Sequence, residues 1–445
     1  MSRTCLVLTV AVIFSIAQSG RALEVTLSEA LARTVEKNFV IQQARSGLEA
    51  AAGRRIVLRA NALPDARIGV AIGLQGGQRA GQDPITPFGF ARGGFAQPLF
   101  DAAIPASRRR GNVEVLIAQQ RLNMAIVSEV HATRTAFYSA LYYRSIERLR
   151  SAQRAKLSRN VAAQTSRYEA GNAPHPIVAA ATLLEQELAP RIEEAHRGYG
   201  AAIVELARAS GSELGPEEKL ATPAGDLRFG SLHLDLARET AAAKRDRPDL
   251  KLARLLVLAS AEDQRIIEAA YYPEVNAVVS GDYIPVSGIR RGSEGSPRRS
   301  DDIISSEIRA GAAYTWRVVD NGKTGGAVLR QRSAREINEL LSQKLEANVP
   351  RELERLYNNL AALTARHRSL EDAARAAEAS TAAVNRNVGN GVLSQLDFRT
   401  SEASLLEAQS GLEDAAYQQS LALAEWDRAT GRYFQFTDQR GAEAR

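Results

Sequence analysis

The sequence predicts a mixed α and β membrane protein with an internal duplication. Three observations lead to this fold class. Segments far apart in the chain resemble each other, and four segments alternate apolar and polar residues with a period of two. In addition, a run of roughly sixty residues has no strong helix breaker except Pro350, and its part from Val349 to Val388 keeps the spacing of a coiled-coil seam. Few folds combine long coiled-coil helices with strands of this length.

The duplication has a long period. Leu63–Gly73 resembles Tyr272–Gly281, so that Pro64 corresponds to Pro273 (273 − 64 = 209). Two further correspondences are Phe100-Asp101 with Val319-Asp320 and Gly171-Asn172 with Gly389-Asn390 (389 − 171 = 218). Because solenoid repeats are far shorter, the pattern indicates one fold built from two similar halves.

These correspondences predict four segments of the chain. Residues 1–22 form a signal peptide, and residues 432–445 form a C-terminal tail. The first repeat, 23–222, contains a helix, strands at 64–75 and 90–100, a long helix, a turn near 171 and a further helix. The second repeat, 223–431, contains a helix, strands at 273–284 and 304–318, a long helix, a turn near 389 and a further helix.

The signal peptide is predicted from its three parts. Arg3 supplies the positive charge, Leu6–Ala17 is a short apolar stretch, and Gly20 and Ala22 place small residues before a cleavage site. The apolar stretch is shorter than the approximately 20 residues that span a bilayer. The single cysteine, Cys5, would leave with the signal, which excludes disulfides, a cysteine nucleophile and a thiolate metal site from the exported chain.

The charge of the chain is mildly basic. Its 445 residues carry a formal net charge of +6, and basic and acidic residues alternate along the helical stretches. Alternation of this kind is typical of a solvated helix face, so no nucleic-acid partner is expected.

Four segments show the alternation of amphipathic strands. In the first, Ile68, Val70, Ile72 and Leu74 are apolar, whereas the intervening residues are charged, small or polar. The segment after Pro273 and the segment that ends near Val318 alternate in the same way, and Phe90–Phe100 is weaker because it contains Pro98. Each stretch has about the length of a tilted strand that crosses an outer membrane.

A soluble sheet with four amphipathic strands is the alternative. A membrane wall is favoured by the export signal, by the charged opposite face and by aromatic residues expected near the strand ends, namely Phe90, Phe100, Tyr283 and Trp316. In lipid the strands must form a closed barrel, and four strands are too few to close one. A membrane location therefore requires several copies of the chain to share a barrel.

The second long helix carries the coiled-coil pattern. From Val349 to Val388 the seam positions follow a four-three spacing. All of them are apolar except His367 and Thr381. The whole helical run between Gly322 and Gly389, roughly sixty residues, forms a rod of roughly 100 Å at about 1.5 Å per residue. The first copy, from Ala106 to Ala170, is similar but less regular. Rods of this length need other rods to pack against.

Several motifs resemble those of the TolC-like outer-membrane efflux proteins. They are Val25–Leu31 at the mature start, Leu63-Pro64 at the first strand, Gln97–Asp101 after the second strand, and Gly391–Glu402 at the second helical turn. The resemblance extends from about Val25 to Gly431. It implies a homotrimeric channel-tunnel, in which each chain gives four strands to one shared barrel and its long helices form a periplasmic α-helical barrel.

The family also implies function and location. It implies a passive exit duct in the bacterial outer membrane, in contact with lipid, that serves a tripartite efflux pump or a type I secretion system. A periplasmic adaptor protein and an inner-membrane transporter are the implied partners. A periplasmic coiled-coil adaptor or structural spacer is the alternative, because it would share the helices, although it would not explain four strands of membrane-spanning length.

The resemblance places a possible gate at the periplasmic turns. Gly171, Gly389 and Gly391 mark the turns, and Asp397 matches one of two acidic rings that narrow the family's tunnel. The second ring falls on Thr400, the basic latch residue on Leu393, and the first-copy position of Asp397 on Ala179, so the sequence departs from the pattern there. Asp397 is also well placed to cap a helix, and both interpretations stay open.

No catalytic or metal site is predicted. The five histidines, His131, His175, His196, His233 and His367, have no His or Cys partner at ligand spacing. Gly322-Lys323-Thr324 lacks the earlier glycine of a phosphate loop and is interpreted as a strand-to-helix turn. We therefore expect neither an enzyme nor a cofactor.

Overall fold

The computed structural model describes residues 24–77, 85–212, 222–231, 234–290, 300–389 and 392–432. The predicted signal peptide and most of the predicted tail lie outside these residues. The chain divides into two compact units. The helical unit comprises the described parts of Met1–Asn38, Glu129–Leu232 and Asn359–Glu425, and the sheet unit comprises those of Phe39–Ser128, His233–Asn358 and Trp426–Arg445.

The elements follow one another in an order that occurs twice. The first copy contains α1 (Leu27–Lys37), α2 (Phe39–Ala60), β2 (Asp65–Gly76), β3 (Ile85–Phe100), α3 (Ala103–Glu169), α4 (His175–Gln186) and α5 (Leu188–Ser210). The second contains α6 (Leu236–Asp246), α7 (Pro248–Glu268), a short 3₁₀ turn η1 (Ala269–Tyr271), β5 (Glu274–Arg290), β6 (Ser300–Thr315), α8 (Lys323–Gly389) and α9 (Gln395–Thr430). The long helices α3 and α8 each have 67 residues.

The boundaries predicted for the two repeats stay a prediction. The proposed boundary between residues 222 and 223 falls inside β4 (Thr222–Pro223), a short strand that pairs in parallel with β1 (Glu24–Val25). The start of the first copy and the start of the second are thus joined by a two-residue pairing.

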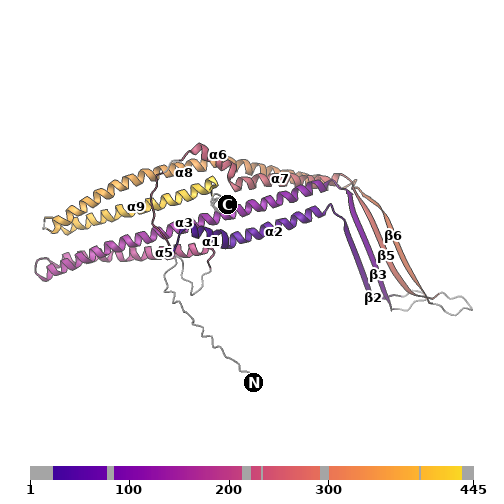
Figure 1. Ribbon diagram of the computed structural model, residues 1–445, viewed down its shortest axis with the longest axis horizontal. Helices are drawn as coiled ribbons and strands as arrows, with labels where there is room; N and C mark the ends of the chain where they lie inside the picture. The colour runs from indigo at the N-terminus through magenta and orange to yellow at the C-terminus, as the bar shows by residue number, and fades with distance from the viewer. Residues whose placement is uncertain are drawn as a thin grey trace, which may run out of the picture. The chain divides into compact units, whose positions relative to one another are not determined.

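The sheet unit holds a four-stranded antiparallel sheet in the order β2-β3-β5-β6 (Figure 1). Residues Ala71↔Phe90, Phe95↔Val279 and Val279↔Ala310 are cross-strand partners that fix the register. A bulge between Pro98 and Phe100 interrupts the β3·β5 ladder, because proline cannot donate a ladder hydrogen bond. Among the described strands, β2 and β6 are the two edges of this sheet.

The strand limits differ in part from the prediction. The third strand was expected to end at 284 but continues to Arg290, and the second begins at Ile85 rather than 90. The fourth ends at Thr315 instead of 318, because its last partner is Glu274 and the preceding Pro273 has no N–H for a further rung. Trp316 therefore lies beyond the strand, where its indole nitrogen donates to the Tyr271 carbonyl at 3.2 Å.

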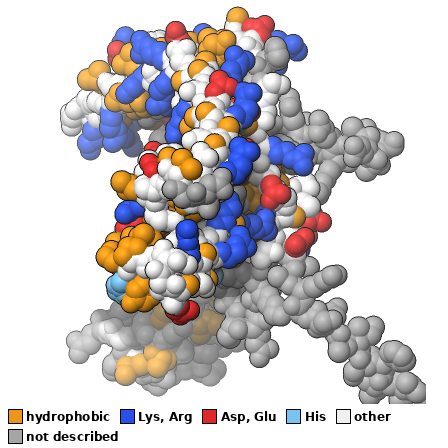
Figure 2. Space-filling model, turned by 90° about the vertical axis from the view of Figure 1, so that its left-hand side faces the viewer, with side chains coloured by type: hydrophobic (Ala, Val, Ile, Leu, Met, Phe, Trp, Pro, Cys, Tyr) orange, Lys and Arg blue, Asp and Glu red, His pale blue; other side chains and the backbone are white. Residues whose placement is uncertain are grey.

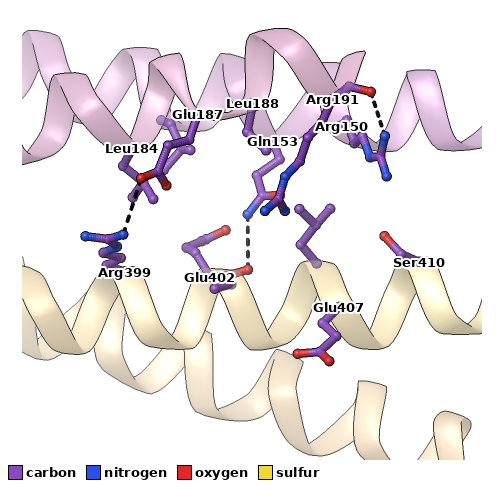
Figure 3. Close-up of a pocket in the computed structure, with 13 residues that line it drawn as sticks. Arg150, Gln153, Leu184, Glu187, Leu188, Arg191, Arg399, Glu402, Glu407 and Ser410 are labelled. Atoms are coloured by element: carbon purple, nitrogen blue, oxygen red, sulfur yellow. Dashed lines mark hydrogen bonds and ion pairs between the residues drawn. The ribbon is translucent and has the colours of Figure 1, made fainter. Parts of the chain in front are cut away.

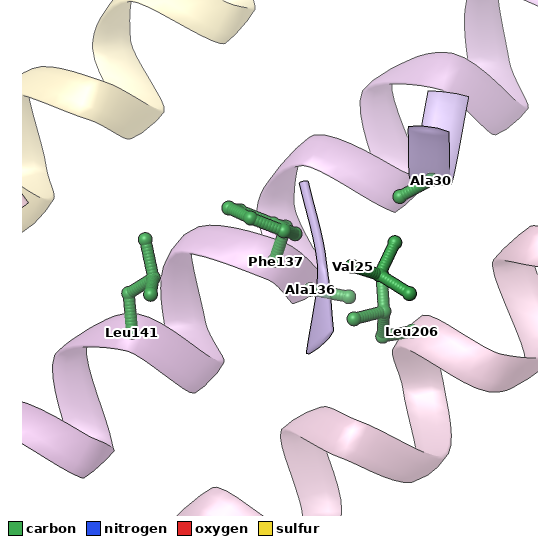
Figure 4. Close-up of a cluster of buried hydrophobic side chains, with 6 residues drawn as sticks. All are labelled: Val25, Ala30, Ala136, Phe137, Leu141 and Leu206. Carbon is green, nitrogen blue, oxygen red and sulfur yellow. The ribbon is translucent and has the colours of Figure 1, made fainter. Parts of the chain in front are cut away.

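In the helical unit, α5 lies beside the second part of α3, and α9 lies beside the last part of α8 (Figure 1). The segment around Thr26 at the start of α1 forms a capping box. Thr26 Oγ1 accepts from the Glu29 N–H, and Glu29 Oε2 accepts from the Thr26 N–H. Figure 4 shows the apolar cluster that anchors this segment, formed by Val25, Ala30, Ala136, Phe137, Leu141 and Leu206.

The predicted coiled-coil seam of α8 is buried. Leu353 is fully buried, and the seam positions Val349, Leu356, Leu360, Leu363, Ala374 and Thr381 are all less than 9% exposed. His367, the polar seam residue, stacks on Phe229 with 3.8 Å between the ring centroids. A flat aromatic partner explains how the seam accommodates a histidine. No helix in the described residues has a stretch both long and apolar enough for a membrane span.

Candidate channel-lining surface and helical turns

The register of the sheet collects the predicted apolar positions on one face. Ile68 lies opposite Gly93, which lies opposite Gly281, which lies opposite Ile308. Directly opposed residues share a face, so the alternation of the separate strands merges into one surface. Large side chains exposed on this face are Ile68, Val70, Ile72, Leu74, Phe95, Val279, Tyr283, Ile308 and Tyr314.

This apolar face is unusually exposed. Ile68 is 85% exposed and Ile72 is 84% exposed, values that a soluble sheet with its apolar side on a core would not give. A contiguous apolar surface of this kind marks a site that another apolar phase covers. Together with strands of 12 to 17 residues, it is typical of a surface that faces lipid.

The opposite face is polar, and its charges are paired. Arg92 Nε donates to Asp282 Oδ1 at 2.6 Å across the β3·β5 ladder. Along single strands, Arg67 pairs with Asp65 at 2.6 Å, and Arg309 pairs with Glu307 at 2.6 Å. Each arginine is thus next to a carboxylate, which keeps the local charge of this face close to balance.

Aromatic side chains also lie on the polar face. Phe88 and Phe90 stack with 6.2 Å between their centroids, and the Arg92 guanidinium lies 5.5 Å from the Phe90 centroid. Phe90 was expected near a strand end, but β3 begins at Ile85, so Phe90 lies within the strand. Its partner is Ala71, so Phe90 points to the polar side from within β3. A one-residue difference in register reverses the face of a strand residue, and the sequence of β3 is too irregular to reveal it.

Both predicted helical turns are present. After α3, Gly171 adopts a left-handed conformation with φ of 76°, and the Asn172 N–H donates to the Arg167 carbonyl at 2.7 Å. After α8, which ends at Gly389, the Val392 N–H donates to the Asn387 carbonyl at 2.9 Å. Gly391 lies outside the described residues. In the end-on view of Figure 2, basic side chains (blue) are prominent over the helix ends that face the viewer.

Asp397 lies in the first turn of α9, where it completes a capping box with Ser394. The Ser394 N–H and hydroxyl both donate to Asp397 Oδ2, at 2.9 and 2.6 Å, and the Asp397 N–H donates to Ser394 Oγ at 3.2 Å. The hydrogen bonds from the Ser394 side chain and backbone lower the pKa of Asp397, although the carboxylate is fully exposed. The carboxylate is therefore an exposed, ionised cap at neutral pH.

The other positions compared at the turns do not add charge. Thr400 donates its hydroxyl to the Leu396 carbonyl at 3.0 Å within α9, and Ala179 is an exposed residue of α4. The first turn has no acidic cap, because the residue before α4 is Pro174 and makes no side-chain hydrogen bond. The two turns of the chain thus differ in charge at equivalent places.

Sequence reasoning missed the caps of the two long helices. Asp320 accepts from the Gly322 N–H at 3.0 Å and from the Thr324 N–H at 2.7 Å, which confirms the strand-to-helix turn at this place. Asp101 accepts in the same manner from the Ala103 N–H at 2.7 Å. The duplicated aspartates were the available signal, because aspartate is a preferred residue at helix starts.

The described residues contain no group of three or more His, Cys, Asp or Glu side chains that could hold a metal ion. His131 and His196 each lie near one glutamate, at 3.4 and 3.1 Å, in ordinary ion-pair positions. In the described chain, the candidate functional features therefore lie in two places, the faces of the sheet and the helical turns.

Comparison with known proteins finds one family model that is similar to part of the chain. The family model of the outer membrane efflux protein matches residues 241–432. No curated protein sequence matches the chain.

Solved structures match over almost the whole chain at low identity. The outer membrane protein VceC of Vibrio cholerae is 16% identical, with a TM-score of 0.73 over 91% of this chain and 96% of that one. The CmeC outer membrane channel of Campylobacter jejuni is 12% identical, with a TM-score of 0.76 over 91% and 85%. The MtrE outer membrane channel of Neisseria gonorrhoeae, in its open state, is 15% identical, with a TM-score of 0.73 over 91% and 88%.

These matches confirm the predicted resemblance to the TolC-like proteins. The structural matches establish the fold, and the family match covers the second copy of the duplication. The chain is thus similar over its second copy to the outer membrane efflux protein family, and as a whole it has the fold of the solved outer membrane channels.

Proposed function

We propose that three copies of the chain form a passive duct in the bacterial outer membrane that carries substrates from the periplasm to the exterior. The observation that carries this proposal is the sheet, whose exposed apolar face and two free edges are incompatible with a single soluble chain. The free edge β2 of each copy pairs with the free edge β6 of the next copy in the ring, and the polar face then lines the lumen.

A tripartite efflux pump or a type I secretion system is the setting that we propose for this duct. In either one, a periplasmic adaptor protein would contact the helical region, and an inner-membrane transporter would supply the energy. The long buried seam of α8 supports a helical periplasmic extension, because it provides coiled-coil packing over most of the helix.

The orientation of the sheet is testable with two matched tryptophan variants. Ile72→Trp lies on the apolar face and Ala71→Trp on the polar face of the same strand. In vesicles containing brominated lipid, we expect strong additional quenching of the tryptophan in Ile72→Trp and little in Ala71→Trp, each relative to the wild-type chain. Equal quenching of both, or a monomer that stays in the periplasmic fraction, would contradict the duct and favour a periplasmic spacer.

We further propose that Asp397 forms a ring of three carboxylates at the periplasmic end of the lumen. Its lowered pKa supports this role, because the ring would stay charged at neutral pH and favour cations. In planar bilayers, Asp397→Asn should shift the reversal potential in a salt gradient towards that of a non-selective pore. Because asparagine also caps helices, an unchanged reversal potential would leave Asp397 with the capping role alone.

A further inference from the structure

The helical unit contains a cavity that the duct does not explain. It has a volume of about 460 Å³ and lies between α3, the α4–α5 region and α9 (Figure 3). Its apolar wall is formed by Leu157, Leu184, Leu188 and Leu406. A cavity of this size matches the pockets that hold small organic ligands.

A buried amide in this cavity has an unused acceptor. Gln153 is 9% exposed, and its Nε2 donates to the Glu402 backbone carbonyl at 3.1 Å. This bond fixes the orientation of the amide, because the oxygen could not bond to a carbonyl. Gln153 Oε1 is buried and has no partner among the described residues. A buried acceptor without a donor costs free energy, so a donor is expected to fill this position.

Two charged groups beside Gln153 are also unmatched. Glu402 is only 4% exposed as a residue, its side chain makes no ion pair or hydrogen bond within the described chain, and its carboxylate oxygens are not fully enclosed. Arg191 is an exposed residue of α5, and its guanidinium makes no ion pair or hydrogen bond within the described chain, whereas Arg399 pairs with Glu187 at 3.6 Å at the edge of the cavity. Figure 3 shows the Gln153, Arg191 and Glu402 side chains in the space between the helices, while Glu407 points away from it.

We propose that this cavity binds a free α-amino acid with an apolar side chain. The ammonium group would donate to Glu402 and to Gln153 Oε1, the carboxylate would pair with Arg191, and the alkyl group would lie on the leucine wall. These contacts satisfy two unused acceptors and one unused cation with a single zwitterion. A simple amine would leave Arg191 unmatched, and a simple carboxylate would leave Glu402 buried beside a second anion.

Calorimetric titration of the full-length protein in detergent with L-leucine tests this proposal. We expect saturable binding of one L-leucine per chain. N-acetyl-L-leucine lacks the ammonium and L-leucinamide lacks the carboxylate, and each should bind at least about tenfold more weakly because one charge-assisted contact is lost. These analogues leave the protein unchanged, so they test the site even if a variant fails to fold.

Matched variants then assign the contacts. Glu402→Gln and Arg191→Gln should each weaken L-leucine binding by at least about tenfold. Glu407→Gln makes the same chemical change on α9 with a side chain that points out of the cavity, and it should leave binding unchanged. Absence of saturable binding at millimolar L-leucine, equal binding of the analogues, or equal effects of Glu402→Gln and Glu407→Gln would overturn the proposal. None of these outcomes bears on the duct, whose test is the tryptophan quenching.

Discussion

The two copies of the duplication use different chemistry at an equivalent joint. Each joint lies where two helices meet, at Asn38 between α1 and α2 and at Arg247 between α6 and α7 (247 − 38 = 209). Asn38 Nδ2 donates to the Ala209 carbonyl at 2.9 Å and to Glu129 at 2.8 Å. Arg247 Nη1 donates to the Ala429 carbonyl at 3.3 Å.

The second joint adds two carboxylates to this pattern. Arg247 Nη1 donates to Glu352 at 2.5 Å, and Arg247 Nη2 donates to Asp249 at 2.8 Å. Burial works against the charge of Arg247, but the hydrogen bonds with Asp249 and Glu352 outweigh it and raise the pKa of Arg247 above its ordinary value. The same backbone contact is thus held by a neutral amide in one copy and by a buried ion network in the other.

One glycine packs against each joint, and the two glycines also share a backbone conformation but differ in their surroundings. Gly211 and Gly431 both adopt left-handed conformations, with φ of 70° and 76°, and end the helices that carry the accepted carbonyls. An added Cβ at Gly211 would lie 2.5 Å from the Lys37 carbonyl group, whereas at Gly431 it would lie 3.3 Å from the Arg247 nitrogen. The neutral joint is therefore the more tightly packed one. The duplication has kept the backbone geometry and changed the side-chain chemistry.

The largest effect should come from removal of the cation in the second joint. Arg247→Met leaves Asp249 without its buried partner and Glu352 with Arg428 alone, and we expect a loss of about 3–5 kcal/mol of local stability. Hydrogen exchange of the full-length protein should show loss of protection in the last turn of α9, with the last turn of α5 unchanged. Unchanged protection near Ala429 would show that the network does not hold this helix end.

A proline exchange tests a second difference between the copies. The hairpin arm of the first copy is divided into α4 and α5, whereas α9 is continuous. Pro190 explains the division, because its ring clashes with the carbonyl of Gln186, where α4 ends. Counted from the glycines that end α5 and α9, Gly211 and Gly431 (431 − 211 = 220), the corresponding residue is Ser410 (410 − 190 = 220).

Ser410→Pro should divide α9 in the same way at a cost of about 3 kcal/mol. We expect increased hydrogen exchange around residue 406 and a lower melting temperature. Ser410→Ala is the control and should retain the wild-type protection. A proline variant with an intact exchange pattern would mean that packing, not Pro190, divides the first arm.

The neutral joint should respond less than the charged one. Asn38→Ala removes the donor to the Ala209 carbonyl and to Glu129, and we expect a loss of about 1–3 kcal/mol because Glu129 keeps Arg208 as a cationic partner at 3.8 Å. Hydrogen exchange at the last turn of α5 reports the change. If Asn38→Ala lowered local stability as much as Arg247→Met does at the second joint, the proposed difference between the two joints would be wrong.

Much of this fold was predictable because its signals are local. The alternation around Ile68 and the seam around Leu353 are periodic, and the structure places both as predicted. The position of Phe90 was not predictable, because it depends on register with Ala71. Pro190 was visible in the sequence but was not used to divide the helix.

The joints and the cavity depend on partners far apart in the chain. Asn38 and Arg247 are dissimilar residues, so comparison of the two copies did not align them, and their carbonyl partners lie 171 and 182 residues away. Gln153 becomes notable only when its buried oxygen is seen to lack a donor. At Asp397 the sequence left two roles open. The structure adds the capping box, which is compatible with a ring of carboxylates in an assembly.

A fall in pH should also distinguish the two joints, and its effect on stability should be the smallest of those predicted. Burial raises the pKa of Asp249, but its hydrogen bonds and charge interaction with Arg247 prevail, so the folded-state pKa lies below the usual value of 3.8. Protons therefore bind more weakly to the folded state, and the stabilisation from Asp249 is complete above pH 3.8 and is lost as the pH falls through the folded-state pKa. Between pH 7 and 5 the stability of the joint should not change.

Melting curves at pH 5 and pH 3 should show a smaller acid-induced decrease in melting temperature for Asp249→Asn than for the wild type, because asparagine keeps an oxygen for the Leu250 N–H but cannot titrate. Asn38 itself carries no titrating group, so Asn38→Ala should keep the wild-type difference between the two pH values. An equal decrease in the wild type and Asp249→Asn would assign the acid sensitivity to other carboxylates of the chain.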